Sequence, residues 1–240
     1  MSIEKMFNSK NASATKEEHW IPLSDLMTGL MLIFLLIAIV FMQKVEADSK
    51  KVKDVARIYD EMRNDLYKDL QKEFRIDLPK WGAELDTDLT LRFKEPDVLF
   101  DTGKDTLKPD FIKILDDFFP RYIKILTAEK YRTSIEEIRV EGHTSSAWSG
   151  ATNPNTAYFL NMALSQSRTR STLQHVLSQE AVISEQQWLK AHLTANGLSS
   201  SKLIKKPDGT EDKEGSQRVE FRVRTNADAR LNEILGTITK

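Results

Sequence analysis

The chain contains no cysteine among its 240 residues, so a disulfide framework and a thiolate-ligated metal site are both excluded. An excess of charge of one sign is also lacking, because 35 Lys and Arg residues stand against 36 Asp and Glu residues. The resulting net charge of -1 provides no basic field of the kind that binds a nucleic-acid backbone. We therefore expect no direct binding of nucleic acid.

The sequence also lacks the groupings of residues that enzymatic chemistry requires. It offers no paired carboxylates, no Ser-His-Asp set and no zinc ligands at useful spacing in the region where a ligand would bind. Of its four histidines, His143 is expected to be a hydrogen-bonded loop residue rather than a catalyst or a metal ligand. We therefore expect no enzymatic activity and no cofactor.

What the chain does have is one long apolar run near its N-terminus. Residues Ile21–Met42 read IPLSDLMTGLMLIFLLIAIVFM and as a helix would span about 33 Å, at roughly 1.5 Å per residue. This predicts a transmembrane helix over residues 21–43, preceded by a leader at residues 1–20. A cleaved signal peptide remains the alternative, because Val45-Glu46-Ala47 loosely imitates a cleavage site.

Asp25 is the only formal charge within the apolar run. A carboxylate desolvated among apolar side chains can take up and release a proton rather than stay permanently ionised. Ser24 and Thr28 flank Asp25 at helical spacing and could hydrogen-bond its protonated form. Two simpler interpretations stay open: a carboxylate near a helix start is stabilised by the helix dipole, and small hydroxyl residues are common in helix packing.

Residues 44–79 are predicted to form a charged helical connector, since they contain no glycine and a single proline at the end. Apolar residues recur there at the spacing of a short coiled-coil seam, namely Val52, Val55, Tyr59, Met62 and Leu66. The heptad fails afterwards, where Asp69 and Glu73 would occupy seam positions. A dimer seam and a solvated spacer are both compatible with this pattern.

Beyond Pro79 the pattern changes to that of a folded domain over residues 80–226, followed by a tail at residues 227–240. Alternating apolar residues indicate strands around the turn Asp86-Thr87-Asp88, at Ile135, Ile138 and Val140, and in QRVEFRVRT at residues 217–225. These strands are the expected framework of the domain.

Helices are indicated between these strands. One is expected after Lys108-Pro109, a second over Thr156–Leu177, and a third over Ser184–Asn196 with Gly197 in the C-cap position. Helices that alternate with strands imply a mixed sheet with helices on one face. The predicted fold class is therefore α+β, with a single N-terminal transmembrane helix and a helical connector.

Four motifs of the predicted domain, in their order along the chain, resemble the OmpA-like peptidoglycan-binding domain. They are Phe100 with Leu107-Lys108-Pro109, then Val140-Glu141-Gly142-His143-Thr144, then Asn161-x-x-Leu164-Ser165-x-x-Arg168, and finally Arg218-Val219-Glu220-Phe221. The resemblance covers about residues 80–226 and implies a mixed-sheet α/β sandwich. In that family the loop after the GHT strand and the start of the next helix bind the diaminopimelate of the peptide stem.

The resemblance implies a peptidoglycan site made of Thr144, Ser145, Ser146, Asn161, Leu164 and Arg168. Arg168 suits a carboxylate because its planar guanidinium can bind one bidentately, although a structural ion pair is the alternative. The family usually has aspartate directly after GHT, where this chain has Ser145, so the carboxylate that would meet the ligand's ammonium is missing. Trp148 or Asn155 could compensate for it.

The start of the apolar run, with Trp20, Pro22, Ser24 and Asp25, resembles the MotB-type stator helix, whose aspartate binds the translocated ion. The whole layout resembles the ZorB family, the stator-type subunits of the Zorya anti-phage system, and the GHTSS-x-W loop points the same way. This resemblance implies a dimer of the chain inside a pentamer of a multi-pass MotA/ZorA-like partner. Ion flow past Asp25, protons rather than sodium, would drive rotation, and the connector would serve as a plug or a spacer.

The resemblance also implies a location in the bacterial inner membrane. Lysines on both sides of the apolar run leave the orientation undecided by charge. We expect a cytoplasmic N-terminus and a periplasmic C-terminal domain, because peptidoglycan lies outside the inner membrane. Two other functions stay open: a flagellar-type stator subunit, and a passive envelope tether for which Asp25 is incidental.

Overall fold

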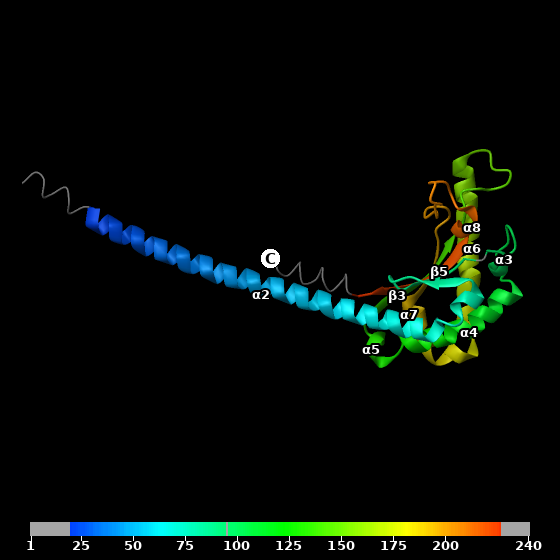
Figure 1. The fold of residues 1–240 in the computed structure, drawn as a ribbon, viewed down its shortest axis with the longest axis horizontal. Coiled ribbons are helices and arrows are strands. Elements are labelled where there is room, and N and C mark those ends of the chain that lie inside the picture. The colour runs from blue at the N-terminus through cyan, green and yellow to red at the C-terminus, as the bar shows by residue number, and fades with distance from the viewer. Residues whose placement is uncertain (1–19, 95, 227–240) are drawn as a thin grey trace, which may run out of the picture. The chain divides into compact units, whose positions relative to one another are not determined.

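The computed structural model describes residues 20–94 and 96–226, which are drawn in colour in Figure 1. The predicted leader, apart from Trp20, and the predicted tail at 227–240 lie outside the described residues. The chain divides into two compact units, one containing the residues up to Val55 and the other spanning Ala56–Ile234.

Helix α2, Trp20–Phe74, carries the apolar run in its first part. Large apolar side chains are exposed all around this part of the helix, from 48% for Ile39 to 74% for Phe34. Such a surface is stable in lipid rather than in water, and the helix satisfies its own backbone hydrogen bonds. Among the helices in the described part of the chain, α2 is the one long and apolar enough to cross a membrane. The expected N-terminal apolar helix is confirmed.

The last turns of α2 belong to the core of the second unit. Leu66, Leu70 and Phe74 recur every four residues on one face of the helix and are fully buried. Asp69 and Glu73, which break the heptad, accept hydrogen bonds from other parts of the domain: Tyr131 donates to Asp69 over 2.7 Å, and Arg121 donates to Glu73 over 2.7 Å. The apolar pattern of the helix therefore does not stop at Leu66, because Leu70 and Phe74 extend it and pack into the core of the domain.

The second unit is built on a five-stranded mixed sheet in the order β1-β2-β5-β3-β4. Its strands are β1 Ala83–Leu85, β2 Thr90–Phe93, β3 Ile135–His143, β4 Leu193–Gly197 and β5 Arg218–Thr225. Strand β4 is parallel to β3, and the other neighbours are antiparallel. The mixed sheet predicted from the alternating patterns is confirmed.

Helices α3 to α8 connect the strands of the second unit along the chain (Figure 1). They are α3 Pro96–Leu99, α4 Pro109–Leu126, α5 Glu129–Arg132, α6 Pro154–Leu177, α7 Gln186–His192 and α8 Lys213–Ser216, with 3₁₀ turns η2 Leu78–Trp81 and η3 Glu180–Glu185. Both long helices, α4 and α6, lie on the sheet face that carries Val140 and Phe221, since Phe118 of α4 contacts Phe221 and α6 lies against Gly142.

The helix predicted over Ser184–Asn196 is wrong in its second half. Residues Gln186–His192 are helical, but Leu193–Gly197 forms β4, with Leu193 opposite Ile138 and Gly197 opposite Gly142. The local sequence His-Leu-Thr-Ala-Asn suits a helix or a strand, so pairing with the free edge of β3 decides its conformation. That pairing joins segments far apart in the chain and leaves no local signature.

Aromatic side chains fill the space between α2, α4 and the sheet. The ring of Phe118 lies 5.3 Å from Phe74, 5.4 Å from Phe93 and 5.2 Å from Phe221, measured between centroids. These tilted and edge-on contacts are the geometries that aromatic pairs favour. Phe118 therefore ties the end of α2, the sheet and α4 into one core.

We expect Phe118→Ala to destabilise the domain by about 3–5 kcal/mol, because it removes a fully buried ring and leaves a cavity. Phe159→Ala is the matched control, since Phe159 is 69% exposed and its loss should change stability by less than about 0.5 kcal/mol. Urea unfolding followed by circular dichroism measures both variants. Equal midpoints for the two variants would contradict the assignment of Phe118 to the core.

Candidate functional site

The predicted ion-binding residues lie in the first turns of α2. The Thr28 hydroxyl donates a hydrogen bond to the carbonyl oxygen of Ser24 over 2.8 Å, one helical turn earlier. Asp25 is exposed on the helix surface, and within residues 20–94 and 96–226 no hydrogen bond or ion pair reaches its carboxylate. The residues that the structure describes thus give the Asp25 carboxylate no partner.

The predicted peptidoglycan-binding loop begins where β3 ends at His143. The Thr144 N–H donates to the carbonyl oxygen of Ser199 over 2.9 Å. The buried side-chain amide of Asn161 donates to the carbonyl oxygens of Ser145 and Ala147, over 3.1 and 3.2 Å. Asn161 therefore fixes the shape of this loop, and Thr144 and Ser145 are themselves buried.

Helix α6 can lie close to the sheet because two of its contacts are with glycine. A Cβ atom on Gly142 would lie 2.7 Å from Cγ2 of Thr169 and 2.9 Å from the carbonyl oxygen of Ser165. A Cβ atom on Gly197 would lie 2.3 Å from the backbone nitrogen of Gln166. Both approaches are too close for any other residue, so these glycines set the position of α6 beside the loop.

Arg168 lies two helical turns beyond Asn161 on the same face of α6. Its Nε donates to the carbonyl oxygen of Lys104 over 2.8 Å, and Nη2 donates to that of Asp101 over 3.1 Å. The guanidinium carbon lies 4.8 Å from the centre of the Phe100 ring, within the range of a cation–π contact. The Arg168 side chain thus holds the backbone of the segment that follows Phe100.

The charge of Arg168 is retained at neutral pH. Burial lowers the pKa of Arg168 to about 10, and the negative charge of Asp105 opposes that effect. Within the described parts of the chain, Nη1 has no acceptor and no carboxylate lies within ion-pair distance of the guanidinium. Arg168 can therefore still offer a charged N–H pair to an acceptor from another molecule.

A carboxylate that sequence analysis missed stands beside the loop. Glu211 accepts a hydrogen bond from the backbone N–H of Ser146 over 2.8 Å, and the Ser146 hydroxyl donates to its other oxygen. Ser145, at the position of the family aspartate, is buried, whereas Ser146 is exposed and Glu211 half-buried. Sequence analysis named Trp148 and Asn155 instead, because nothing local connects Glu211 with a loop 65 residues earlier.

Leu164 is half-buried on α6, between Asn161 and Arg168. A small cavity of about 10 Å³, roughly the size of one water molecule, is lined by Phe100, His143, Ser165, Arg168 and Arg218 among others. The structure therefore places Arg168 and the end of the GHT strand around one enclosed space.

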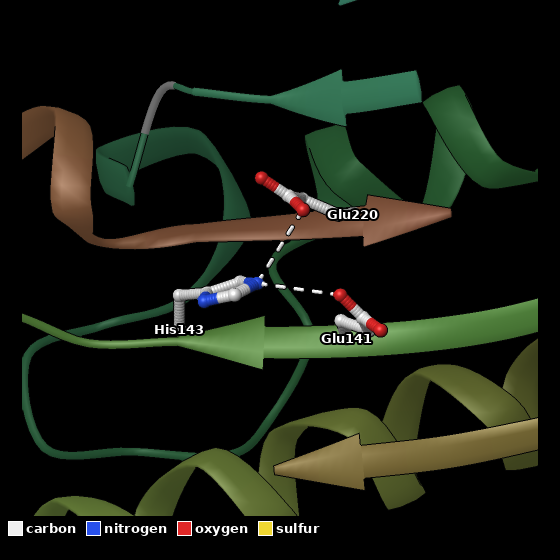
Figure 2. Close-up of side chains that lie close together, drawn as sticks. All are labelled: Glu141, His143 and Glu220. Carbon is white, nitrogen blue, oxygen red and sulfur yellow. Dashed lines mark ion pairs between the residues drawn. The ribbon is translucent and has the colours of Figure 1, made fainter. Parts of the chain in front are cut away.

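A second cluster lies on the sheet face opposite the aromatic core. Glu141 and His143 alternate with Val140 and Gly142 along β3, and the pairing of the strands places Glu220 of β5 directly opposite Glu141. Figure 2 shows the three side chains converging, with Nε2 of His143 at 3.5 Å from a Glu220 oxygen and 3.9 Å from a Glu141 oxygen. The expectation of a hydrogen-bonded loop histidine is wrong, because His143 ends a strand and both its ring nitrogens are buried without a hydrogen-bond partner.

Two arginines hold one side of the Glu220 carboxylate. Nε of Arg92 and Nε of Arg218 donate to the same Glu220 oxygen over 2.7 and 2.6 Å. Burial acts to raise the pKa of Glu220, but the contact with His143 and the two arginine hydrogen bonds outweigh it and keep the pKa well below its usual range. The distance of 3.5 Å from Nε2 of His143 to the Glu220 oxygen is longer than a normal hydrogen bond. Glu220 is therefore ionised at any physiological pH.

Comparison with known proteins gives one strong sequence match. No family model matches the chain. It is 48% identical over 219 residues to the "Zorya protein ZorB" of Escherichia coli strain Crooks, which covers 91% of this chain and 92% of that protein. The match therefore includes both the apolar helix and the folded domain.

Solved structures show the fold. A MotB-like protein from Desulfovibrio vulgaris superposes with a TM-score of 0.51 at 21% identity, over 71% of this chain and 98% of that chain. The periplasmic domain of Helicobacter pylori MotB gives a TM-score of 0.44 at 16% identity, over 66% of this chain and 99% of that one. The first of these matches confirms the mixed-sheet domain fold predicted from the four motifs.

Removal of the Asn161 amide tests whether its two hydrogen bonds hold the loop. Asn161→Ala should destabilise the domain by about 1–3 kcal/mol, because the buried carbonyl oxygen of Ser145 and the partly buried one of Ala147 lose their donor. Asn155→Ala, at an exposed position of the same helix, serves as the control and should change stability by less than about 0.5 kcal/mol. Urea unfolding measures both variants, and an Asn161→Ala midpoint equal to that of the parent would show that the amide does not hold the loop.

Proposed function

The chain belongs to the family of the Zorya protein ZorB, and on that basis we propose that it is the stator-like, wall-anchoring subunit of an ion-driven motor that defends a bacterium against phage. The sequence identity of 48% extends over 91% of the chain, so it includes the helix that bears Asp25 as well as the domain. The observation that carries the proposal is this combination of a lone carboxylate in an apolar helix with a MotB-like domain. The proposed role is mechanical rather than enzymatic.

We place the chain in the inner membrane as a single-pass protein, with its N-terminus in the cytoplasm and its domain in the periplasm. The unbroken helix supports a permanent anchor over a cleaved signal peptide, since α2 continues through Val45-Glu46-Ala47 into the core residues Leu66, Leu70 and Phe74. Peptidoglycan, the proposed ligand, lies on the periplasmic side. For the connector at residues 44–79, a plug of the ion path and a spacer for the domain remain the two predicted roles.

Asp25 is the proposed ion carrier, and protons are the proposed ion. A lone carboxylate within a bilayer costs on the order of 2.5–3.5 kcal/mol on insertion scales, so it has to be covered by other protein. Asp25 has no partner in the described chain, which supports packing of α2 against a multi-pass MotA/ZorA-like subunit. The family resemblance supplies the stoichiometry, a dimer of this chain inside a pentamer. Each 100 mV of membrane potential provides about 2.3 kcal/mol per charge moved.

The domain is proposed to bind the peptide stem of peptidoglycan through two opposite charges. Arg168 would bind a stem carboxylate through Nη1, and Glu211 would take the role of the family aspartate and meet the ammonium of the diamino acid. The loop Thr144–Ser146, shaped by Asn161, and the half-buried Leu164 would form the surface between them. A charged pair of this kind matches a ligand with both an ammonium and a carboxylate.

Replacement of Asp25 separates a motor from a tether. Asp25→Asn keeps the shape of the side chain but cannot exchange a proton, so protection against phage should fall to the level of cells without the protein. Copurification with the membrane partner and binding to peptidoglycan should persist. The control is Asp54→Asn, at an exposed position of the connector, which should keep protection. Full protection by Asp25→Asn at equal abundance would support the passive tether, and copurification with a flagellar rotor would support the flagellar alternative.

Replacement of Glu211 tests the proposed wall site. Glu211→Gln removes the negative charge but keeps an oxygen that can accept from Ser146, so the affinity for isolated peptidoglycan should fall about tenfold or more, as expected when a charged hydrogen bond is lost. Glu214→Gln, at an exposed position three residues later, should bind like the parent. Cosedimentation with purified peptidoglycan sacculi measures both. Unchanged binding by Glu211→Gln would remove Glu211 from the site.

A further inference from the structure

The polar face of the sheet holds a group of potential metal ligands that the proposed motor and wall anchor do not use. Glu141, His143 and Glu220 are all buried, and one ligand atom from each lies within 4.8 Å of the other two. From this convergence we propose that the three side chains form a binding site for a divalent transition-metal cation of the Zn²⁺ type. The site would join β3 to β5.

The spacing of the ligand atoms suits such a cation. Zn²⁺ binds imidazole nitrogen and carboxylate oxygen at about 2.0–2.2 Å, so ligand atoms around it lie roughly 3.4–3.6 Å apart. Nε2 of His143 lies 3.5 Å from the Glu220 oxygen and 3.9 Å from the Glu141 oxygen. Shifts of a few tenths of an ångström would complete the coordination, and a fourth position would remain for water.

His143 provides the observation that points to a ligand rather than to an ordinary charge cluster. The residue is 3% exposed, and neither Nδ1 nor Nε2 has a hydrogen-bond partner. A buried polar group without a partner costs about 1–3 kcal/mol, so a native site of this kind usually has a further component. Nε2 points between the two carboxylates, as Figure 2 shows, and a cation there would satisfy it.

The neighbouring arginines leave the required oxygens available. Arg92 and Arg218 bind one Glu220 oxygen, and the other oxygen, which faces His143, has only a long contact of 4.0 Å with Nη2 of Arg222. Arg222 is the competitor, because its Nε lies 3.8 Å from the Glu141 oxygen that would bind the metal. Arg222 makes only long contacts, its side chain is 39% exposed, and its Nε lacks a hydrogen-bond partner. It can therefore turn toward Asp88 and solvent when a cation binds.

The strands position the site in advance. Glu141 and Glu220 are register partners on adjacent antiparallel strands, and His143 lies two residues after Glu141 on the same face. Two carboxylates in such directly opposed positions repel each other unless a positive charge lies between them. A nitrogen ligand together with carboxylates favours Zn²⁺ and similar cations over Mg²⁺, which prefers oxygen ligands.

The full-length protein in detergent, treated with EDTA and then dialysed, is the sample for the test. Isothermal titration with ZnCl₂ should show one site per chain, and the melting temperature should rise with Zn²⁺ concentration but not with Mg²⁺. His143→Gln should lower the Zn²⁺ affinity by at least about 100-fold, since it removes a ligand from the metal. His175→Gln is the matched control, because His175 also lies beside a carboxylate, 2.8 Å from Asp116, but at the surface.

Arg222→Gln keeps all three ligands and removes the competing charge, so it should bind Zn²⁺ several-fold more tightly than the parent. This variant also tests the site if His143→Gln does not fold. Absence of Zn²⁺ binding by the parent would overturn the proposal, as would equal affinity of His143→Gln and His175→Gln, or weaker binding by Arg222→Gln. These readouts do not involve wall binding or phage protection, so the metal site stands or falls separately from the proposed function.

Discussion

The register between β3 and β5 is the constraint on which the domain depends. It places Val140 opposite Phe221 in the aromatic core and Glu141 opposite Glu220 on the polar face. Because side chains alternate along a strand, a slip of β3 by one residue against β5 would turn Glu141 and His143 toward Phe118 and the other rings of the core. The same register ends β3 at His143, and so sets where the loop Thr144–Ser146 begins. The register of β3 and β5 therefore positions the aromatic core, the cluster of Glu141, His143 and Glu220, and the start of the candidate wall-binding loop.

Several residues of the family motifs stabilise the domain through the contact of α6 with the sheet and the neighbouring loops. Gly142 and Gly197 allow the helix to approach, Asn161 holds the loop through two carbonyl oxygens, and Arg168 holds the segment after Phe100 through two more. A side chain that is already fixed by the protein loses little entropy when a ligand arrives. Structural use of Arg168 and a role in binding are thus compatible, provided that Nη1 remains free.

Sequence analysis succeeded where a signal is local and failed where it is not. The apolar helix, the alternating strands around Asp86-Thr87-Asp88 and in β5, and the helix after Lys108-Pro109 each follow from their own periodicity. Strand β4 was taken for a helix because its parallel partner lies about 55 residues earlier. Glu211 and the pair of Glu220 with His143 could not be found, since each needs the register of distant segments. The alternation Glu141-x-His143 was the one visible clue, and it acquires meaning only when β5 lies beside it.

Three carboxylates, those of Glu220, Glu211 and Asp25, differ in how many partners the described residues provide for them. One oxygen of Glu220 receives hydrogen bonds from two arginines, and burial makes that pairing obligatory. Glu211 is held by Ser146 but remains half-buried, so part of it is open to a ligand. Asp25 has no partner in the described residues and lies among apolar side chains. An unpaired carboxylate is costly in such surroundings, which is the physical basis for the proposed contact with a membrane partner. Of these three carboxylates, Asp25 is therefore the one that the described residues leave without a partner, and it is the one proposed to bind the ion.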